Sequence, residues 1–287
     1  MIIVKTIAEL QDALFQQRQQ AKTIGFVPTM GNLHHGHLSL VDKAKEVADI
    51  VVVSLFVNPT QFGPNEDFDS YPRTFEADCE KLHNHNTDIV FAPSVEEVYP
   101  GFAQNKTQPN LTKVHVAELG KDHCGAARPG HFDGVTTIVS KLFNMVRPDF
   151  AVFGQKDFQQ LAIIRRMVQD LNIPVTIIGA PILREENGLA MSSRNGYLSQ
   201  EQKDQAAGIH RVLTWAKEQL ITHKLSFDSV EQSAVEQLTN QGFRVDYFNV
   251  SNADTLQVAE VSDKKLVILA AAYLGKVRLI DNVTLTI

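Results

Sequence analysis

Phe26-Val-Pro-Thr-Met-Gly-Asn-Leu-His-His-Gly-His-Leu38 is the segment from which the architecture of this chain can be inferred. Its first residues continue an apolar run that begins at Ile24, which predicts a short buried strand that ends at Pro28. After a turn at Gly31, apolar residues recur at helical spacing, so a helix is expected to begin near Gly36. The predicted unit is therefore a strand, a tight loop and a helix.

The predicted helix start is suited to phosphate, because its free N–H groups and the positive end of its dipole attract anions. His34 and His37 are three positions apart and can turn toward one ligand, while Gly31 and Gly36 let a phosphate or purine approach the backbone. The histidines of this loop could instead bind a metal, although no Asp, Glu or Cys within the loop completes a ligand set. A solvated loop without function is a further alternative. The strand-loop-helix context and a second phosphate-type motif downstream favour a nucleotide.

The composition of the 287-residue chain excludes several classes of protein. This length allows a sizeable core and about two domains, and 44% hydrophobic with 21% charged residues is ordinary for a globular protein. A formal net charge of −6 argues against a large nucleic-acid footprint or a basic membrane surface. The cysteines, Cys79 and Cys124, form no C-x-x-C pattern. Together with the absence of a signal-peptide pattern or a membrane-spanning apolar run, this predicts a cytoplasmic protein.

Residues 1–180 show the alternation of an α/β domain. Residues 50–57 form a continuous β-branched run of the kind that is buried in a parallel sheet, and they follow the first strand and helix as a βαβ unit. Further strands are predicted at 88–93, 149–153 and 174–178, between helices at 6–20, 75–82, 135–146 and 157–171. Residues 100–113 are expected to form an exposed loop. The pattern predicts a Rossmann-like domain with a parallel sheet.

Residues 181–287 have a different pattern. Helices are predicted at 199–217 and 227–240, followed by strands at 245–250, 265–271 and 276–280. Two helices followed by three strands predict a second, smaller C-terminal α+β domain. Residues 120–134 are rich in His and Gly, and an ordinary loop and a functional flap are both consistent with them.

Polar residues follow several of the predicted strands. Asn58 and Gln61 come after the second strand of the βαβ unit and are expected in the same crevice as the histidines, because ligands of open α/β sheets bind at the carboxyl ends of strands. At 154–157 a strand, a glycine and a helix start recur, and Lys156 adds a mobile positive charge there. Met191-Ser-Ser-Arg194 suits a mobile loop that closes over polyphosphate.

Seven motifs in this order resemble those of the pantothenate synthetase (pantoate-β-alanine ligase) family, which is nucleotidylyltransferase-like, and they extend over nearly the whole chain. They are Pro28-Thr-Met-Gly-Asn-Leu-His-His-Gly-His37, Asn58-Pro-Thr-Gln-Phe-Gly63, Tyr71-Pro-Arg-Thr74, Arg128-Pro-Gly-His-Phe-Asp-Gly134, Gly154-Gln-Lys-Asp-Phe-Gln-Gln160, Met191-Ser-Ser-Arg-Asn195 and Arg278-Leu-Ile-Asp-Asn282. Gln155 and His35 depart from the pattern, because many members of the family carry Glu at these positions.

The resemblance implies a set of site residues. It implies an ATP site made by Met30, Gly31, Asn32, Leu33, His34, His35, Gly36, His37, Gly154, Gln155, Lys156, Asp157, Leu183, Met191, Ser192, Ser193 and Arg194. The implied catalytic residues are His37, His34, Lys156 and Arg194. Gln61 and Gln160 would bind pantoate, and Gln61 would also lie at the β-alanine site. The resemblance further implies Mg²⁺ without protein side-chain ligands, a homodimer, and a C-terminal domain that acts as a lid.

The implied reaction has two steps. The carboxylate of (R)-pantoate attacks the α-phosphorus of ATP to give pantoyl adenylate and pyrophosphate, and the amine of β-alanine then displaces AMP to give pantothenate. Two rival interpretations remain open: another adenylating enzyme, either a nucleotidylyltransferase or one like an aminoacyl-tRNA synthetase, and a module that senses ATP without turnover. The acidic balance of the chain and the lack of a basic appendage argue against a tRNA partner.

Overall fold

A computed structural model of the protein describes residues 1–63, 68–102 and 112–287. The larger part of the loop predicted at 100–113 therefore lies outside the described residues. The chain separates into two compact units. The first, here called the N-terminal unit, comprises residues 1–155 and 160–180, and the second, the C-terminal unit, comprises residues 156–159 and 181–287.

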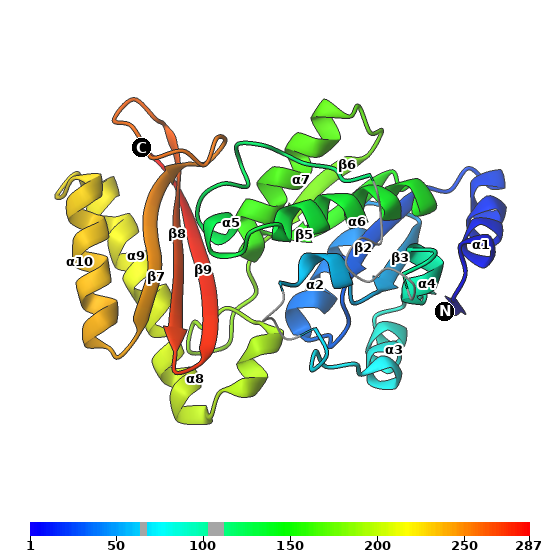
Figure 1. Cartoon of the computed structure of the whole chain (residues 1–287), viewed down its shortest axis with the longest axis horizontal. Coiled ribbons are helices and arrows are strands. Elements are labelled where there is room, and N and C mark those ends of the chain that lie inside the picture. Colours follow the sequence, from blue (N-terminus) through cyan, green and yellow to red (C-terminus); the bar gives the residue numbers. More distant parts are fainter. Residues whose placement is uncertain (64–67, 103–111) are drawn as a thin grey trace. The chain divides into compact units, whose positions relative to one another are not determined.

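The N-terminal unit contains a six-stranded parallel sheet with the order β1-β4-β3-β2-β5-β6 (Figure 1). This sheet confirms the predicted Rossmann-like fold. The sequence did not reveal β1, because only three residues form it and two of them are exposed on the edge of the sheet. The strands are β1 (Ile2–Val4), β2 (Ile24–Thr29), β3 (Ile50–Leu55), β4 (Ile89–Phe91), β5 (Phe150–Gly154) and β6 (Thr176–Ala180).

Helices cover both faces of this sheet. Alternate strand residues point to opposite faces: Val27 and Val53 pack with residues of α2 and α3, whereas Phe26 and Val52 pack with residues of α1, α6 and α7. The helices and 3₁₀ turns of this part of the chain are α1 (Ile7–Gln19), α2 (His35–Lys45), η1 (Pro59–Gln61), α3 (Phe75–Asn84), α4 (Val95–Val98), α5 (Cys124–Ala127), α6 (His131–Val146), η2 (Gln155–Asp157) and α7 (Phe158–Asp170).

The prediction that the first strand ends at Pro28 was wrong, because β2 continues to Thr29. The Ile24 carbonyl accepts from Asp149, next to β5, and the Thr29 carbonyl accepts from Phe56, next to β3. Because the backbone polar groups of successive strand residues point alternately to the two neighbouring strands, those of Pro28 face β5. Pairing between β2 and β5 involves only Gly25 and Phe26. Proline therefore removes no ladder hydrogen bond at this position, and it is tolerated there as on an edge strand.

The C-terminal unit is the predicted α+β arrangement. It contains the antiparallel strands β7 (Arg244–Asn252), β8 (Lys265–Leu274) and β9 (Val277–Thr286), and helices α9 (Gly208–Ile221) and α10 (Phe227–Asn240) pack on one face of their sheet (Figure 1). A 3₁₀ turn, η3 (Ser193–Tyr197), and α8 (Gln200–Ala206) precede them. The single helix predicted at 199–217 is divided at Ala207, next to the helix-weakening Gly208. No helix among residues 1–63, 68–102 and 112–287 is long and apolar enough to cross a bilayer.

Candidate active site

The histidine loop between β2 and α2 places both predicted imidazoles at a helix start. Gly31 and Asn32 have φ values of +79° and +50°, which turn the chain sharply after β2. His34 caps α2: its Nδ1 accepts a hydrogen bond from the Gly36 N–H at 3.1 Å. The Nδ1 atom of His37 accepts in turn from the His34 N–H at 3.4 Å, and the ring centroids are 4.0 Å apart. With Nδ1 as acceptor, a neutral imidazole carries its proton on Nε2, where it can donate.

Sequence reasoning missed the residues of α3 that hold this loop. The buried carboxylate of Asp78 accepts hydrogen bonds from the backbone N–H groups of Asn32 and Leu33, each at 2.8 Å. Lys81 donates to the Leu33 carbonyl at 2.7 Å. One signal was available, because Asp78 lies between Phe75 and Leu82 at helical spacing, where an apolar residue is expected.

Gln61 is held at the carboxyl end of β3 by contacts on both ends of its amide. Its Nε2 donates to the sulfur of Met30 at 2.9 Å, and its Oε1 accepts from the Asn58 amide at 3.1 Å. Asn58 is itself buried and accepts from the Tyr99 hydroxyl at 2.8 Å. Burial raises the pKa of Tyr99 to about 12, so this hydroxyl remains a donor at neutral pH. The predicted substrate residue is therefore fixed against the histidine loop.

The start of α6 packs against η1 and supports Gln61 from a third side. The Nδ1 atom of His131 lies 2.8 Å from the Gln61 carbonyl oxygen. A Cβ atom at Gly134 would lie 2.3 Å from the Thr60 carbonyl oxygen and 2.7 Å from the Gln61 Cα, so only glycine allows this approach. The end of the segment at 120–134 thus contacts a predicted substrate residue.

Within the C-terminal unit, Lys156 and the predicted phosphate loop share one pocket. Lys156, Ser192, Arg194 and Arg278 contribute to its lining, and the Lys156 side chain is 18% exposed. The Oγ atom of Ser192 caps η3 by accepting from the Arg194 N–H at 3.3 Å. Lys156 itself lies in the 3₁₀ turn η2, just before the start of α7. The pocket therefore combines three cationic side chains with a hydroxyl group, and the carboxylate of Asp281, which also lines it, is paired with Arg184; this set suits a polyphosphate.

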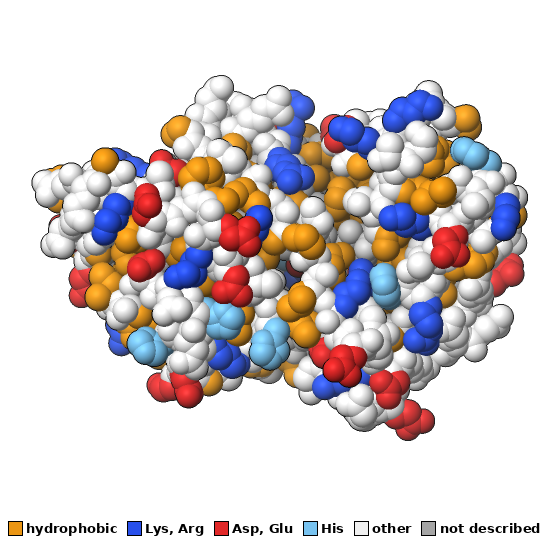
Figure 2. Space-filling model, turned by 180° about the vertical axis from the view of Figure 1, so that it is seen from behind, with side chains coloured by type: hydrophobic (Ala, Val, Ile, Leu, Met, Phe, Trp, Pro, Cys, Tyr) orange, Lys and Arg blue, Asp and Glu red, His pale blue; other side chains and the backbone are white. Residues whose placement is uncertain are grey.

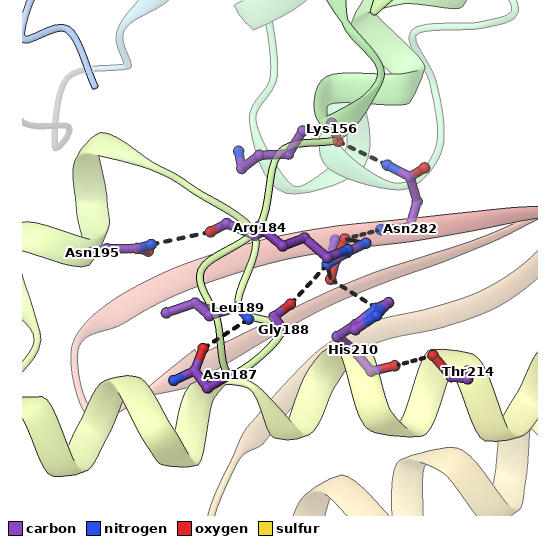
Figure 3. A network of polar contacts seen from close by, with 11 residues as sticks. Lys156, Arg184, Asn187, Gly188, Leu189, Asn195, His210, Thr214 and Asn282 are labelled. Carbon is purple, nitrogen blue, oxygen red and sulfur yellow. Dashed lines mark hydrogen bonds and ion pairs between the residues drawn. The ribbon is translucent and has the colours of Figure 1, made fainter. Parts of the chain in front are cut away.

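A tight hairpin connects the predicted adenine residue to this loop. The Met191 N–H donates to the Leu183 carbonyl at 3.0 Å, and Arg184 pairs with Ala190 across a turn that contains Gly188. Arg184 then binds both carboxylate oxygens of Asp281 on β9, at 2.6 and 3.0 Å (Figure 3). This ion pair, in which Asp281 is almost fully buried, was not predicted from the sequence.

His210 on α9 contacts the same network and is expected to make stability depend on pH. Burial lowers its pKa, the nearby Arg184 lowers it further, and Asp281 opposes them. The unfolded chain therefore binds this proton more readily than the folded one, so the stabilising contribution is complete above about pH 6.5 and is lost as the pH falls below it. His210→Gln should flatten the decrease in unfolding free energy between about pH 7 and about pH 5, as measured by urea titration.

The control is His223→Gln, because His223 is exposed on the turn that follows α9. This variant should keep the wild-type dependence of unfolding free energy on pH. Equal slopes for wild type and His210→Gln would contradict the assignment.

The remaining predicted residues end β5 or follow it directly. Gly154 ends β5, Gln155 and Asp157 belong to η2, and Gln160 lies in the first turn of α7. Across the parts of the chain that the structure describes, no group of three or more His, Cys, Asp or Glu side chains could hold a metal ion.

A parallel sheet with polar loops at the carboxyl ends of β2, β3 and β5 defines a Rossmann-like protein of the nucleotide-binding type. The family model described as pantoate-beta-alanine ligase matches residues 2–284. The chain belongs to the pantoate-β-alanine ligase family.

Three relatives match over at least 97% of their own length. The chain is 54% identical to the pantothenate synthetase of Marinobacter nauticus over 287 residues, which is 100% of both chains. It is similar to the crystal structure of pantothenate synthetase from Thermus thermophilus, with a TM-score of 0.90, 43% identity and 99% of each chain covered. A pantoate-beta-alanine ligase from Francisella tularensis, complexed with beta-gamma ATP and beta-alanine, gives a TM-score of 0.80 at 34% identity and covers 99% of this chain and 97% of its own.

Proposed function

We propose that this chain ligates (R)-pantoate to β-alanine with ATP, through a pantoyl-adenylate intermediate, and releases AMP and pyrophosphate. The match to the ligase family over residues 2–284 carries this proposal. The Francisella relative supports it, because that protein was crystallised with beta-gamma ATP and beta-alanine.

The residue types of the site suit adenylation. A carboxylate attacks a phosphate in this step, so both reactants are anionic and positive groups must offset the charge that develops on the phosphate oxygens. Lys156 and Arg194 are proposed to supply the positive charge, and the Nε2 N–H groups of His34 and His37 are proposed to donate hydrogen bonds to the phosphate oxygens. Mg²⁺ is proposed to add further charge neutralisation, held mainly by substrate phosphates and water.

The other substrate contacts follow from the same proposal. Residues 1–180 would bind ATP and pantoate, with ATP along 30–37 and 154–157 and its ribose at Asp157. Residues 181–287 would form a lid, with the Leu183 backbone at adenine and 191–194 over the phosphates. The neutral amides of Gln61 and Gln160 suit the hydroxyl groups of an anionic acid, because a fixed carboxylate would repel it. β-Alanine would lie beside Gln61, and the active form would be a homodimer.

An ATP–pyrophosphate exchange assay across candidate acids tests the proposal. Exchange should require pantoate, proceed without tRNA, and be followed by pantothenate formation when β-alanine is added. Exchange that depends on an amino acid and tRNA would favour an aminoacyl-tRNA-synthetase-like enzyme, and ATP binding without exchange would favour a sensor. On the face shown in Figure 2, Lys and Arg side chains are interspersed with Asp and Glu, which does not favour a nucleic-acid partner there.

Gln61→Ala and Gln160→Ala are each expected to weaken the use of pantoate far more than the binding of ATP. A site built to bond a hydroxyl loses about 1–3 kcal/mol when one partner is removed, which corresponds to roughly 5- to 150-fold in kcat/KM for pantoate. Steady-state kinetics with each substrate varied in turn measure the two effects separately.

The control is Gln205→Ala, which removes a half-buried glutamine whose Nε2 donates to the Gln241 carbonyl at 2.6 Å. This variant should lose stability but keep the wild-type kcat/KM for pantoate. A wild-type value in Gln61→Ala and Gln160→Ala would remove both residues from the substrate site.

A further inference from the structure

Asn282 is a buried amide on β9 that contacts the backbone of the proposed catalytic lysine. Its side chain is almost fully inaccessible, with only 3% of the residue exposed. Its Nδ2 donates to the Lys156 carbonyl oxygen at 2.9 Å, across 126 positions of sequence (Figure 3). A buried amide donor that loses its acceptor is costly, so this contact constrains where the backbone of Lys156 can lie.

The strand that carries Asn282 is rigidly supported. Asp281 pairs with Ala270 of β8, whose side chain belongs to the core beneath α9 and α10, whereas Asn282 pairs with Leu269. Because consecutive strand residues point to opposite faces, Asn282 lies on the face of the sheet away from that core. Asp281 accepts from the Asn282 N–H at 2.8 Å and is itself bound by Arg184 through two hydrogen bonds. These hydrogen bonds fix the backbone of Asn282 within the C-terminal unit, and so they fix the starting point of its side chain.

Lys156, by contrast, depends on outside contacts for its position. It lies in η2, a 3₁₀ turn of three residues, and such turns have poor internal hydrogen-bond geometry. Its ammonium group is carried on a flexible four-carbon stem, so the starting point of that stem decides what the charge can reach. The nitrogen of this group lies 3.8 Å from a carboxylate oxygen of Asp157. The hydrogen bond from Asn282 fixes the backbone from which the side chain extends into the pocket with Arg194.

We propose that Asn282 is a positioning residue for adenylate formation, which acts through Lys156 and does not touch the substrate. This inference rests on the function proposed above for Lys156. Displacement of a reacting group by about 1 Å can cost on the order of 10²-fold in rate, so loss of the Asn282 amide should lower the adenylation rate markedly. The affinity for ATP should change much less, because the pocket keeps Arg194 and the other lining residues.

The test is a double-mutant cycle in the full-length protein, read by pantoate-dependent ATP–pyrophosphate exchange. Asn282→Ala is expected to lower kcat roughly 10- to 100-fold with little change in KM for ATP. In the Lys156→Ala background the same substitution should cause almost no further loss, because residues that act as a unit are non-additive. The similarly sized Asn282→Leu, which lacks the donor and adds no buried charge, should behave like Asn282→Ala and guards against the effect of a cavity, with circular dichroism as the check of folding.

Asn252→Ala is the matched control. It removes another amide of the same sheet, whose Nδ2 donates to Asp263 at 2.7 Å, and it should reduce stability without reducing kcat. Equal losses from Asn282→Ala in the wild-type and Lys156→Ala backgrounds, or wild-type exchange in Asn282→Leu, would overturn the proposal. Failure of the wild-type protein to catalyse pantoate-dependent exchange would instead overturn the proposed function, and this inference with it.

Discussion

Lys156→Ala is expected to lower adenylate formation by about 10²-fold or more while the protein remains folded, which is the loss seen when one transition-state charge stabiliser is removed. The Lys156 side chain lines a pocket with Ser192, Arg194 and Arg278, and no other lysine among the described residues lines that pocket. Removing it therefore leaves the guanidinium groups of Arg194 and Arg278 in the pocket, but removes the compact ammonium group on its flexible stem. Pantoate-dependent ATP–pyrophosphate exchange measures the loss, and thermal unfolding confirms that the fold is intact.

Lys121→Ala is the control for the loss of one positive charge. Lys121 is 60% exposed and pairs with the nearby Glu118, so its removal should leave exchange unchanged. An exchange rate near the wild-type value for Lys156→Ala would reject the assigned role.

Asp281→Ala is expected to lower the unfolding free energy of the C-terminal unit by about 3–5 kcal/mol, because it leaves a buried charge without its partner. Arg184 is 19% exposed and directs both of its terminal nitrogens at Asp281, which is 4% exposed. Urea titration followed by tryptophan fluorescence is a suitable measurement, since Trp215, the only tryptophan of the chain, lies in α9 of this unit.

The control is Asp204→Ala. Asp204 is exposed and accepts a hydrogen bond from the exposed Asn187 at 2.9 Å, so a loss of no more than about 1.5 kcal/mol is expected. An Asp281→Ala loss no greater than that of Asp204→Ala would show that the ion pair does not anchor the hairpin that carries Leu183.

The elements that could be predicted from sequence are those whose signal is local. The helix at 227–240 has a capping serine and regular apolar spacing, and the predicted bounds agree with α10. The strand β1 could not be found, because three residues carry no usable periodicity and its place in the sheet depends on pairing with β4, far along the chain. The extent of β2 past Pro28 likewise depends on where β5 stops pairing with it.

The candidate site divides in the same way. Short motifs contain the proposed catalytic residues His34, His37, Lys156 and Arg194, and the residue types of these motifs indicate phosphate binding. Asp78 and Asn282 hold those motifs in place, and they do so across 46 and 126 positions of sequence. The helical spacing marks Asp78 as unusual, but a single sequence does not identify the partner of Asp78 or of Asn282, because only the folded chain brings the two members of each pair together.

The early end of pairing between β2 and β5 has a consequence for how the ligand site is made. From β2 the chain adds β3 and then β4 on one side of the sheet, and it later adds β5 and β6 on the other side. The order of strand addition therefore reverses between β2 and β5, which is where ligands of such sheets bind. Between these two strands the ladder stops after Phe26, and Pro28 has no N–H with which to extend it. The backbone itself, and not the surrounding side chains, therefore leaves the carboxyl ends of β2 and β5 without hydrogen bonds to each other.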